Sequence, residues 1–549
     1  MSDNKKRKSL NFYFKNKSYQ LMVFKYLFSI VISFLVLKTT HEWSFVLFNL
    51  LELAIIFSIS NILLKNHKII GQIVNNLLLL LFNIEVLVLL FGNSFVTLIM
   101  INNLSSWEAL KGRIWIFGLG IILLLIFSFL PSRYVQLSRE ERSKLVNNRS
   151  FKLLVVLFLG ELICLGLVGE KYSPASSLYN LGKAEYQYMQ LMKEAKEKSA
   201  HAKEKFHKDD ITNYVSKPQE LPENPNIILI FTEGLSQHII DDTRGIMPNV
   251  SKLQKDSLNF SNYYNHTFAT YCGIIGQLYS GYQLKNPDSN YLVSLQSVLA
   301  NRGYATSFIN TEPNNREFST YLNNMKFGKV VNGTITKGYD VTFDKEAYND
   351  LLNQMSNQSK DKPFFISMYT FGTHIGMDST AKKFQDGKDR VLNRFYNLDV
   401  QIGKFIEKFN QSEFADNTIL VFTTDHATYV DDEYKKAFPN FSRSLGNLDK
   451  VPLFIYHKGV TPSNINVQGR NSINLTPTIL DYLDISSPNY FLGNSLFADK
   501  SQMTDFGATF ISEVSYYSTN ESKVSDFSKE EYEKIKEKVT DYFAASRYP

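Results

Sequence analysis

The stretch PNIILIFTEG, residues 225–234, decides the fold expected for the second half of this chain. A short apolar run that follows a proline and ends at an acidic residue and a glycine predicts a strand buried on both faces. Four further runs of this kind occupy residues 304–310, 363–369, 418–423 and 451–456. Amphipathic segments between them predict helices, among them residues 292–302, 397–409 and 475–483. Strands that alternate with helices predict an α/β domain with a mainly parallel central sheet.

Two of the predicted strands end at residues whose side chains suit a metal ion. Glu233 follows the first strand, and Asp425 and His426 follow the strand at residues 418–423. Ligands of such sheets collect beyond the carboxyl ends of the strands, so we expect these side chains at one edge. Carboxylates and an imidazole suit a divalent ion such as Mn²⁺, Mg²⁺ or Zn²⁺, with a fourth ligand still needed. Taken alone, the same residues also fit helix caps or hydrogen-bonding loops, so both interpretations stay open.

The first third of the chain is far more apolar. Five segments approach membrane-spanning length, at residues 21–37, 43–64, 69–96, 113–130 and 151–169. We therefore expect an N-terminal α-helical membrane domain of five spans. Lys25, Glu52, Glu85 and Glu161 interrupt these segments. An ionisable residue in a span is expected to face a protein partner or a wet cavity, so helix packing and substrate handling are both open for each.

The charges of the predicted loops are unequal on the two sides of the membrane. Three basic residues lie in the first and third loops: Lys38, Lys111 and Arg113. Fourteen lie in the leader and the second and fourth loops: Lys5, Lys6, Arg7, Lys8, Lys15, Lys17, Lys65, Lys68, Arg133, Arg139, Arg142, Lys144, Arg149 and Lys152. By the positive-inside rule the N-terminus is cytoplasmic, and five crossings place everything after Gly169 outside.

Composition divides the chain into three parts. We expect a transmembrane domain at residues 1–170, a helical connector at 171–223 and an extracytoplasmic α/β domain at 224–549. The connector is polar, with a Lys/Glu-rich stretch, and ends among Pro218, Pro222 and Pro225. Its pattern fits a juxtamembrane helix that is either a solvated spacer or an amphipathic contact with the membrane.

The overall composition excludes several classes of protein. The 549 residues are 44% hydrophobic, 14% aromatic and 20% charged, which excludes a disordered chain. A net charge of +6 is too small for nucleic acid to be the main partner. Cys164 and Cys272 are the only cysteines, which excludes a disulfide framework and a cysteine-based zinc site.

An ordered set of motifs carries a family resemblance. The motifs are PNIILIFTEG, MPNVSKLQKDSLNFSNYYNHTFATYCGIIGQLYSG, SLQSVLANRGYATSFI, FGTHIG, NTILVFTTDHA, VPLFIY, LTPTILDYLDI and LGNSLF. Together they resemble the alkaline phosphatase and sulfatase superfamily, and within it the lipoteichoic acid synthase type of membrane phosphoglycerol transferase. Five spans followed by an external sulfatase-like domain are the architecture of that group and of the lipid A phosphoethanolamine transferases. The resemblance covers essentially the whole chain and implies an enzyme of a bacterial cell membrane.

The resemblance implies roles for residues near the predicted sheet edge. Glu233 matches the first metal ligand of the family, and Asp425 and His426 match the pair that closes the metal site. Thr270, in FATYCGIIG, falls at the position of the nucleophile, which also contacts the metal. A bound cation lowers the pKa of a threonine hydroxyl, so this role is chemically sound. Thr267 is the alternative nucleophile, and a helix N-cap is the structural alternative for Thr270.

The resemblance also implies substrate contacts. His374, in FGTHIG, matches a catalytic and substrate-binding histidine that contacts the phosphate or leaving group, with a purely hydrogen-bonding role as the alternative. Arg316 is carried over as a substrate-binding residue, although it precedes Phe318 whereas the family's arginine follows its aromatic residue. Asp399 matches a family aspartate and is expected to be structural here. His457 could be an extra ligand, but a packed or surface histidine is the favoured interpretation.

The motifs favour group transfer over hydrolysis. Sulfatases need a C-x-P-x-R context, which is missing after Cys272, and two-metal phosphatases need further Asp and His ligands. The resemblance therefore implies one divalent metal ion, Mn²⁺ before Mg²⁺ or Zn²⁺. It implies phosphoglycerol transfer from a phospholipid such as phosphatidylglycerol, through a phosphothreonine-type intermediate, to a cell-envelope glycan or glycolipid.

Two other functions stay open. One is phosphoethanolamine transfer, although two cysteines cannot provide the several disulfides usual in the lipid A class. The other is a non-catalytic membrane protein that binds glycan or lipid. The joint presence of Glu233, Thr270, Asp425 and His426 argues against that second alternative.

Overall fold

The computed structural model describes residues 16–92, 94–102, 114–136, 149–198, 200–283, 289–359, 361–443, 445 and 447–547. The chain divides into two compact units, Met1–Tyr186 and Gln187–Pro549. The helix α8 (Pro174–Glu197) runs across this division and is followed by the short 3₁₀ helix η3 (Ala200–Phe206). The boundaries expected after residues 170 and 223 stay predictions.

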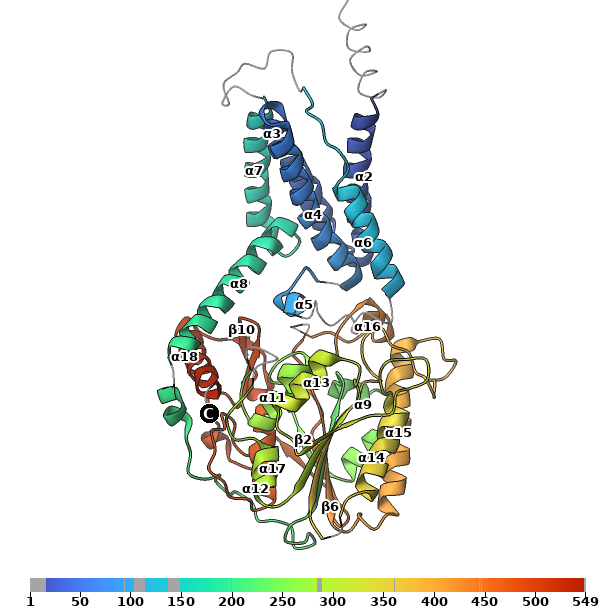
Figure 1. The fold of residues 1–549 in the computed structure, drawn as a ribbon, viewed down its shortest axis with the longest axis vertical. Helices are drawn as coiled ribbons and strands as arrows, with labels where there is room; N and C mark the ends of the chain where they lie inside the picture. The colour runs from blue at the N-terminus through green and yellow to red at the C-terminus, as the bar shows by residue number, and fades with distance from the viewer. Residues whose placement is uncertain are drawn as a thin grey trace, which may run out of the picture. The chain divides into compact units, whose positions relative to one another are not determined.

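The first unit contains a bundle of apolar helices (Figure 1). Four are long and apolar enough to cross a membrane: α2 (Lys17–Thr40), α3 (Trp43–Asn66), α4 (Lys68–Gly92) and α7 (Arg149–Val168). α3 packs against α4 and α7, and α2 packs against α4. The short helix α5 (Leu98–Asn102) follows α4, so the third apolar segment ends as a helix at Gly92, before the expected residue 96.

The fifth expected span corresponds to α6 (Ile114–Ser128), which has 15 residues among those described. About 1.5 Å per residue makes a helix of this length shorter than a bilayer core. The count of five spans is therefore not confirmed. Lys5, Lys6, Arg7, Lys8, Lys15, Lys111, Arg113, Arg139, Arg142 and Lys144 lie outside the described residues, and the orientation across the membrane stays a prediction.

Ionisable side chains of the bundle have protein partners. The buried Lys25 ammonium donates to the Asn75 and Asn76 side-chain oxygens at 2.7 and 2.6 Å. Glu52 accepts hydrogen bonds from the Ser173 hydroxyl at 2.7 Å and the Ala175 backbone N–H at 3.0 Å. These contacts support helix packing for Lys25 and Glu52.

The second unit is built on an eight-stranded sheet of order β4-β3-β5-β1-β6-β7-β2-β8. The strands are β1 (Asn226–Thr232), β2 (Leu258–Ser261), β3 (Ala305–Asn310), β4 (Lys329–Asn332), β5 (Phe364–Tyr369), β6 (Thr418–Thr424), β7 (Phe454–Tyr456) and β8 (Ser463–Asn466). Strands β4, β3, β5, β1 and β6 run parallel, and β7 is antiparallel to both β6 and β2. The predicted α/β domain with a mainly parallel sheet is therefore confirmed.

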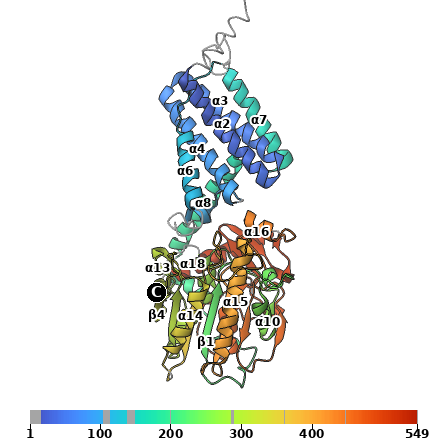
Figure 2. The ribbon, with the colours of Figure 1, turned by 90° about the vertical axis from the view of Figure 1, so that its right-hand side faces the viewer.

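Helices cover both faces of this sheet (Figure 2). They are α9 (Gln237–Ile240), α10 (Pro248–Lys255), α11 (Thr270–Tyr279), α12 (Leu295–Asn301), α13 (Arg316–Asn324), α14 (Asp344–Ser356), α15 (Arg390–Asn410), α16 (Asp432–Ala437), α17 (Leu475–Tyr482) and α18 (Lys529–Ser546). A small sheet of β9 (Thr509–Ser512), β10 (Ser515–Ser518) and β11 (Ser525–Asp526), with the 3₁₀ helices η4 (Ser472–Asn474), η5 (Lys500–Gln502) and η6 (Asn520–Ser522), completes the unit.

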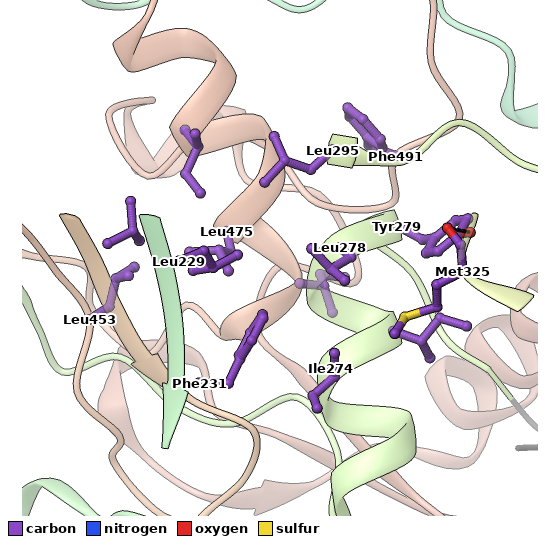
Figure 3. Packing of buried hydrophobic residues seen from close by; sticks show 14 of the residues in the cluster. Leu229, Phe231, Ile274, Leu278, Tyr279, Leu295, Met325, Leu453, Leu475 and Phe491 are labelled. Atoms are coloured by element: carbon purple, nitrogen blue, oxygen red, sulfur yellow. Dashed lines mark hydrogen bonds between the residues drawn. The ribbon is translucent and has the colours of Figure 1, made fainter. Parts of the chain in front are cut away.

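The side chains of β1 divide between two hydrophobic cores. Leu229 and Phe231 enter the core that includes α11 and α17, whereas Ile228 and Ile230 enter the core that includes α10, α14 and α15. Figure 3 shows Leu229 and Phe231 on the side of Ile274, a residue of α11. Alternate residues of a strand point to opposite faces, which explains why the run 226–232 is apolar throughout.

Candidate active site

The edge of the sheet at β1 and β6 brings the expected metal ligands together. Thr232 and Thr424, the last residues of these neighbouring strands, are paired in register. Glu233 and Asp425 therefore leave the sheet side by side. The Asp425 N–H donates to the Thr232 carbonyl at 3.1 Å, and the Gly234 N–H donates to Asp425 Oδ1 at 2.9 Å.

The imidazole of His426 completes this group. Its Nδ1 lies 2.7 Å from the Ala427 carbonyl oxygen, so this nitrogen carries the proton of the neutral ring. Nε2 then presents its lone pair 3.4 Å from Asp425 Oδ2 and 3.6 Å from Glu233 Oε1. Ligand atoms of the three residues all lie within 4.8 Å of one another.

The three side chains are buried, and their ionisation depends on each other. Burial and the charge of Glu233 raise the pKa of Asp425 above its ordinary value. Burial alone lowers the pKa of His426, but the charges of Asp425 and Glu233 outweigh it and raise that pKa. Among the described residues, the buried Asp425 Oδ2 has no hydrogen-bond partner. Two buried carboxylates, an imidazole lone pair and a bare carboxylate oxygen fit a divalent cation.

Thr270 lies beside this group as the first residue of α11. Its hydroxyl donates to Glu233 Oε2 at 3.3 Å. The preceding Ala269 is the N-cap of the helix and has φ 75° and ψ 146°, a conformation that costs a non-glycine residue energy. Thr270 is thus inside the helix instead of capping it.

The alternative nucleophile, Thr267, lies elsewhere. Its hydroxyl donates to the Ile511 carbonyl at 2.6 Å, and the residue is 7% exposed. The geometry thus favours Thr270 over Thr267 for contact with Glu233.

His374 follows β5 in a loop that is hydrogen-bonded to Glu233 through its neighbour Thr373. The neighbouring Thr373 hydroxyl donates to the Glu233 carbonyl at 2.5 Å. The half-buried His374 ring stacks on Phe371, with 4.9 Å between centroids, and its Nδ1 lies 3.1 Å from the Ile375 carbonyl. Burial lowers the pKa of His374, whereas the charge of Glu233 opposes this change.

Arg316 is exposed at the start of α13. Within the described part of the chain, no interaction joins its side chain to Glu233, Asp425 or His426. Its substrate-binding role stays a prediction.

Two other residues singled out in the sequence have structural partners. Asp399 accepts hydrogen bonds from the Asn249 side chain and the Val250 N–H at 2.7 and 2.8 Å. His457 lies 2.9 Å from the Tyr482 hydroxyl and belongs to no metal-binding group among the described residues.

Sequence reasoning missed residues that shape the site. The buried Tyr369, at the end of β5, donates its hydroxyl to Glu233 Oε2. Gly273 faces the backbone of Asp425. The glycine in TYCGIIG was visible in the sequence, but nothing there marked Tyr369 as a partner of Glu233.

Comparisons with known proteins agree with this fold. Residues 225–485 match the sulfatase family. The uncharacterized sulfatase YdeN of Escherichia coli is 26% identical over 142 residues, which cover 23% of this chain and 25% of that protein. The match thus spans about a quarter of the curated relative.

Two solved structures align with this chain at low sequence identity. The lipooligosaccharide phosphoethanolamine transferase EptA from Neisseria meningitidis, an integral membrane protein, aligns over 86% of this chain and 97% of its own, with TM-score 0.51 and 13% identity. The lipoteichoic acid synthase LtaP from Listeria monocytogenes aligns over 61% of this chain and 93% of its own, with TM-score 0.45 and 17% identity.

The fold and the matched residues define a membrane protein with an α/β domain of the sulfatase type. The match of residues 225–485 to the sulfatase family, together with the fold shared with EptA, supports the resemblance to the alkaline phosphatase and sulfatase superfamily drawn from the motifs.

Proposed function

We propose that this protein is a metal-dependent transferase that moves a phosphoglycerol head group from an outer-leaflet phospholipid to a cell-envelope glycan or glycolipid. One observation carries the proposal: the Thr270 hydroxyl contacts Glu233 within a buried Glu-Asp-His group that follows two neighbouring strands. A hydroxyl nucleophile beside such a group suits attack on a phosphodiester.

The metal ligands in this proposal are Glu233, Asp425, His426 and the hydroxyl of Thr270. Mn²⁺ is the proposed ion, because mixed carboxylate and imidazole ligands suit it, with Mg²⁺ and Zn²⁺ as alternatives. A divalent cation there would stabilise charge on the phosphate oxygens and lower the pKa of the nucleophile.

The reaction is a double displacement. The Thr270 hydroxyl passes its proton to Glu233 Oε2, and its oxygen forms a bond to phosphorus while the bond from phosphorus to the diacylglycerol oxygen breaks. In this proposal His374, in its protonated form, gives its Nε2 proton to that leaving oxygen. An acceptor hydroxyl then gives its proton to His374 and bonds to phosphorus while the bond from phosphorus to the Thr270 oxygen breaks, and Thr270 regains its proton from Glu233. Arg316 is proposed to bind the substrate.

Phosphoglycerol is the preferred head group. Cys164 and Cys272 are both free, so the disulfides usual in lipid A phosphoethanolamine transferases cannot form. In this proposal α6 belongs to a fifth span, and the excess of basic residues in the inner loops places the catalytic unit outside the cytoplasm. Membrane attachment keeps the active site near its lipid donor and raises the effective donor concentration.

The proposal is tested by incorporating the purified full chain into liposomes with Mn²⁺ and envelope glycan. One sample contains phosphatidylglycerol labelled in its head-group glycerol, and a parallel sample contains phosphatidylethanolamine labelled in its head-group ethanolamine. We expect label in the glycan and free diacylglycerol in the lipid phase. Label moved only from phosphatidylethanolamine would establish the phosphoethanolamine alternative. Glycan binding without turnover of either lipid would establish a non-catalytic protein.

A further inference from the structure

Tyr369 is the last residue of β5, and Glu233 directly follows the neighbouring strand β1. Tyr369 is paired in register with Phe231, and Glu233 lies two residues beyond Phe231, just after the end of β1. The phenol therefore reaches the carboxylate diagonally across the ladder, and its hydroxyl donates to Glu233 Oε2. Tyr369 is 1% exposed, and the Phe318 ring packs against it with 5.5 Å between centroids.

The two oxygens of Glu233 have different surroundings. Oε2 accepts from both the Tyr369 and Thr270 hydroxyls. Oε1 lies 3.6 Å from His426 Nε2, among the ligand atoms. The phenol hydroxyl donates this hydrogen bond, because the ionised carboxylate of Glu233 can only accept.

We infer that Tyr369 is a positioning residue that leaves Glu233 only one oxygen for the cation, and that it thereby sets which divalent cation the site selects. The inference rests on the metal site of the proposed function. Asp425 is constrained similarly, because its Oδ1 accepts from the Gly234 and His426 N–H groups while Oδ2 stays bare. Each carboxylate thus offers one oxygen.

Carboxylates that each bind the cation through one oxygen make a compact metal site with few ligand atoms. Ca²⁺ takes six to eight oxygen ligands and readily accepts both oxygens of one carboxylate, whereas smaller ions need fewer and closer ligands. A buried donor on Oε2 therefore disfavours Ca²⁺ relative to Mn²⁺. Loss of that donor leaves Oε2 with only the Thr270 hydroxyl at 3.3 Å and lets Glu233 rotate toward a two-oxygen arrangement.

The experiment titrates the full chain in detergent, first stripped of metal, with MnCl₂ and with CaCl₂ in a calorimeter. The variant is Tyr369→Phe, which removes only the hydroxyl. The matched control is Tyr348→Phe on α14, because Tyr348 is also buried and its hydroxyl has no hydrogen-bond partner among the described residues.

We expect Tyr369→Phe to raise the Mn²⁺ dissociation constant about 10- to 100-fold, as is usual when a partner of a metal ligand is lost. The preference for Mn²⁺ over Ca²⁺ should fall in this variant and stay unchanged in Tyr348→Phe. Unchanged affinity and preference in a folded Tyr369→Phe protein would overturn the inference and leave the proposed function intact. A wild-type protein that binds neither cation would instead overturn the metal site itself.

A second measurement uses only the wild-type protein, in case Tyr369→Phe does not fold. Infrared difference spectra between Mn²⁺-loaded and metal-free protein separate one-oxygen from two-oxygen carboxylate ligands by the spacing of their two stretching bands. We expect the wide spacing of one-oxygen ligands. The narrow spacing of a two-oxygen ligand would contradict the inference.

Discussion

A methyl group on Gly273 would lie 2.1 Å from the carbonyl oxygen of Asp425. Helix α11 thus approaches the end of β6 so closely that only a glycine fits at this position. Thr270 lies one helical turn earlier, so this packing also fixes the distance between its hydroxyl and Glu233.

The first prediction concerns this packing. Gly273→Ala should push α11 away from Asp425 and lower diacylglycerol release from phosphatidylglycerol about 100-fold, the cost of a shift of about 1 Å at a catalytic group. The control is Gly182→Ala in α8, where nothing lies within 4 Å of the added methyl. Equal activity of the two variants would mean that the approach of α11 does not set the site.

The second prediction concerns the backbone before Thr270. At φ 75° and ψ 146°, Ala269 is strained, and glycine adopts this conformation without a Cβ clash. Ala269→Gly should raise the free energy of unfolding by about 1 kcal/mol, whereas the branched side chain of Ala269→Val should lower it by about the same amount or more. Urea unfolding followed by near-ultraviolet circular dichroism measures both. A lower free energy of unfolding in Ala269→Gly would show that the backbone at Ala269 is not strained.

The third prediction concerns metal removal. A chelator should abolish diacylglycerol release, and added Mn²⁺ should restore it. His426→Ala should lose Mn²⁺ binding and lower activity by orders of magnitude, because it removes the imidazole that faces both carboxylates. His457→Ala is the control, since His457 is also buried but contacts Tyr482. Full activity after chelation would exclude the metal site.

The fourth prediction concerns pH. Burial raises the pKa of Asp344 from 3.8 to about 7, and its Oδ1 accepts from the Gly372 N–H at 3.1 Å, in the loop of His374. The folded protein therefore holds this proton more tightly than the unfolded chain, so stability falls as pH rises from about 4 to 7. Asp344→Asn does not titrate and should flatten this decline. Free energies of unfolding at pH 5 and pH 7 test it, and an unchanged slope would contradict the assignment.

Much of the central fold could be predicted because the core strands are long apolar runs. Strands β1, β3, β5 and β6 all lie within or next to the expected ranges. The short strands β2, β4 and β8 lack such runs and were missed. The run at residues 451–456 forms a strand only at Phe454–Tyr456, which lies antiparallel to β6. Sequence patterning carries no signal for that direction.

The candidate site also has some residues that could be predicted from the sequence and others that could not. Glu233, Asp425 and His426 could be placed together because they lie within two residues of the ends of two strands, and parallel strands end at one edge. The role inferred for Tyr369 depends on the register between β1 and β5, which pairs Tyr369 with Phe231. The need for a glycine at position 273 depends on how closely helix α11 approaches the end of strand β6. Both are tertiary relationships that one sequence does not encode in any local pattern.

The central claim is that Thr270 carries the head group covalently. The most direct measurement is mass spectrometry of the full chain, quenched in acid during turnover of phosphatidylglycerol without acceptor. We predict a phosphoglycerol adduct on Thr270, with no adduct and no diacylglycerol release in Thr270→Ala, and partial activity in Thr270→Ser. An adduct on Thr267, or wild-type turnover in Thr270→Ala, would contradict the account.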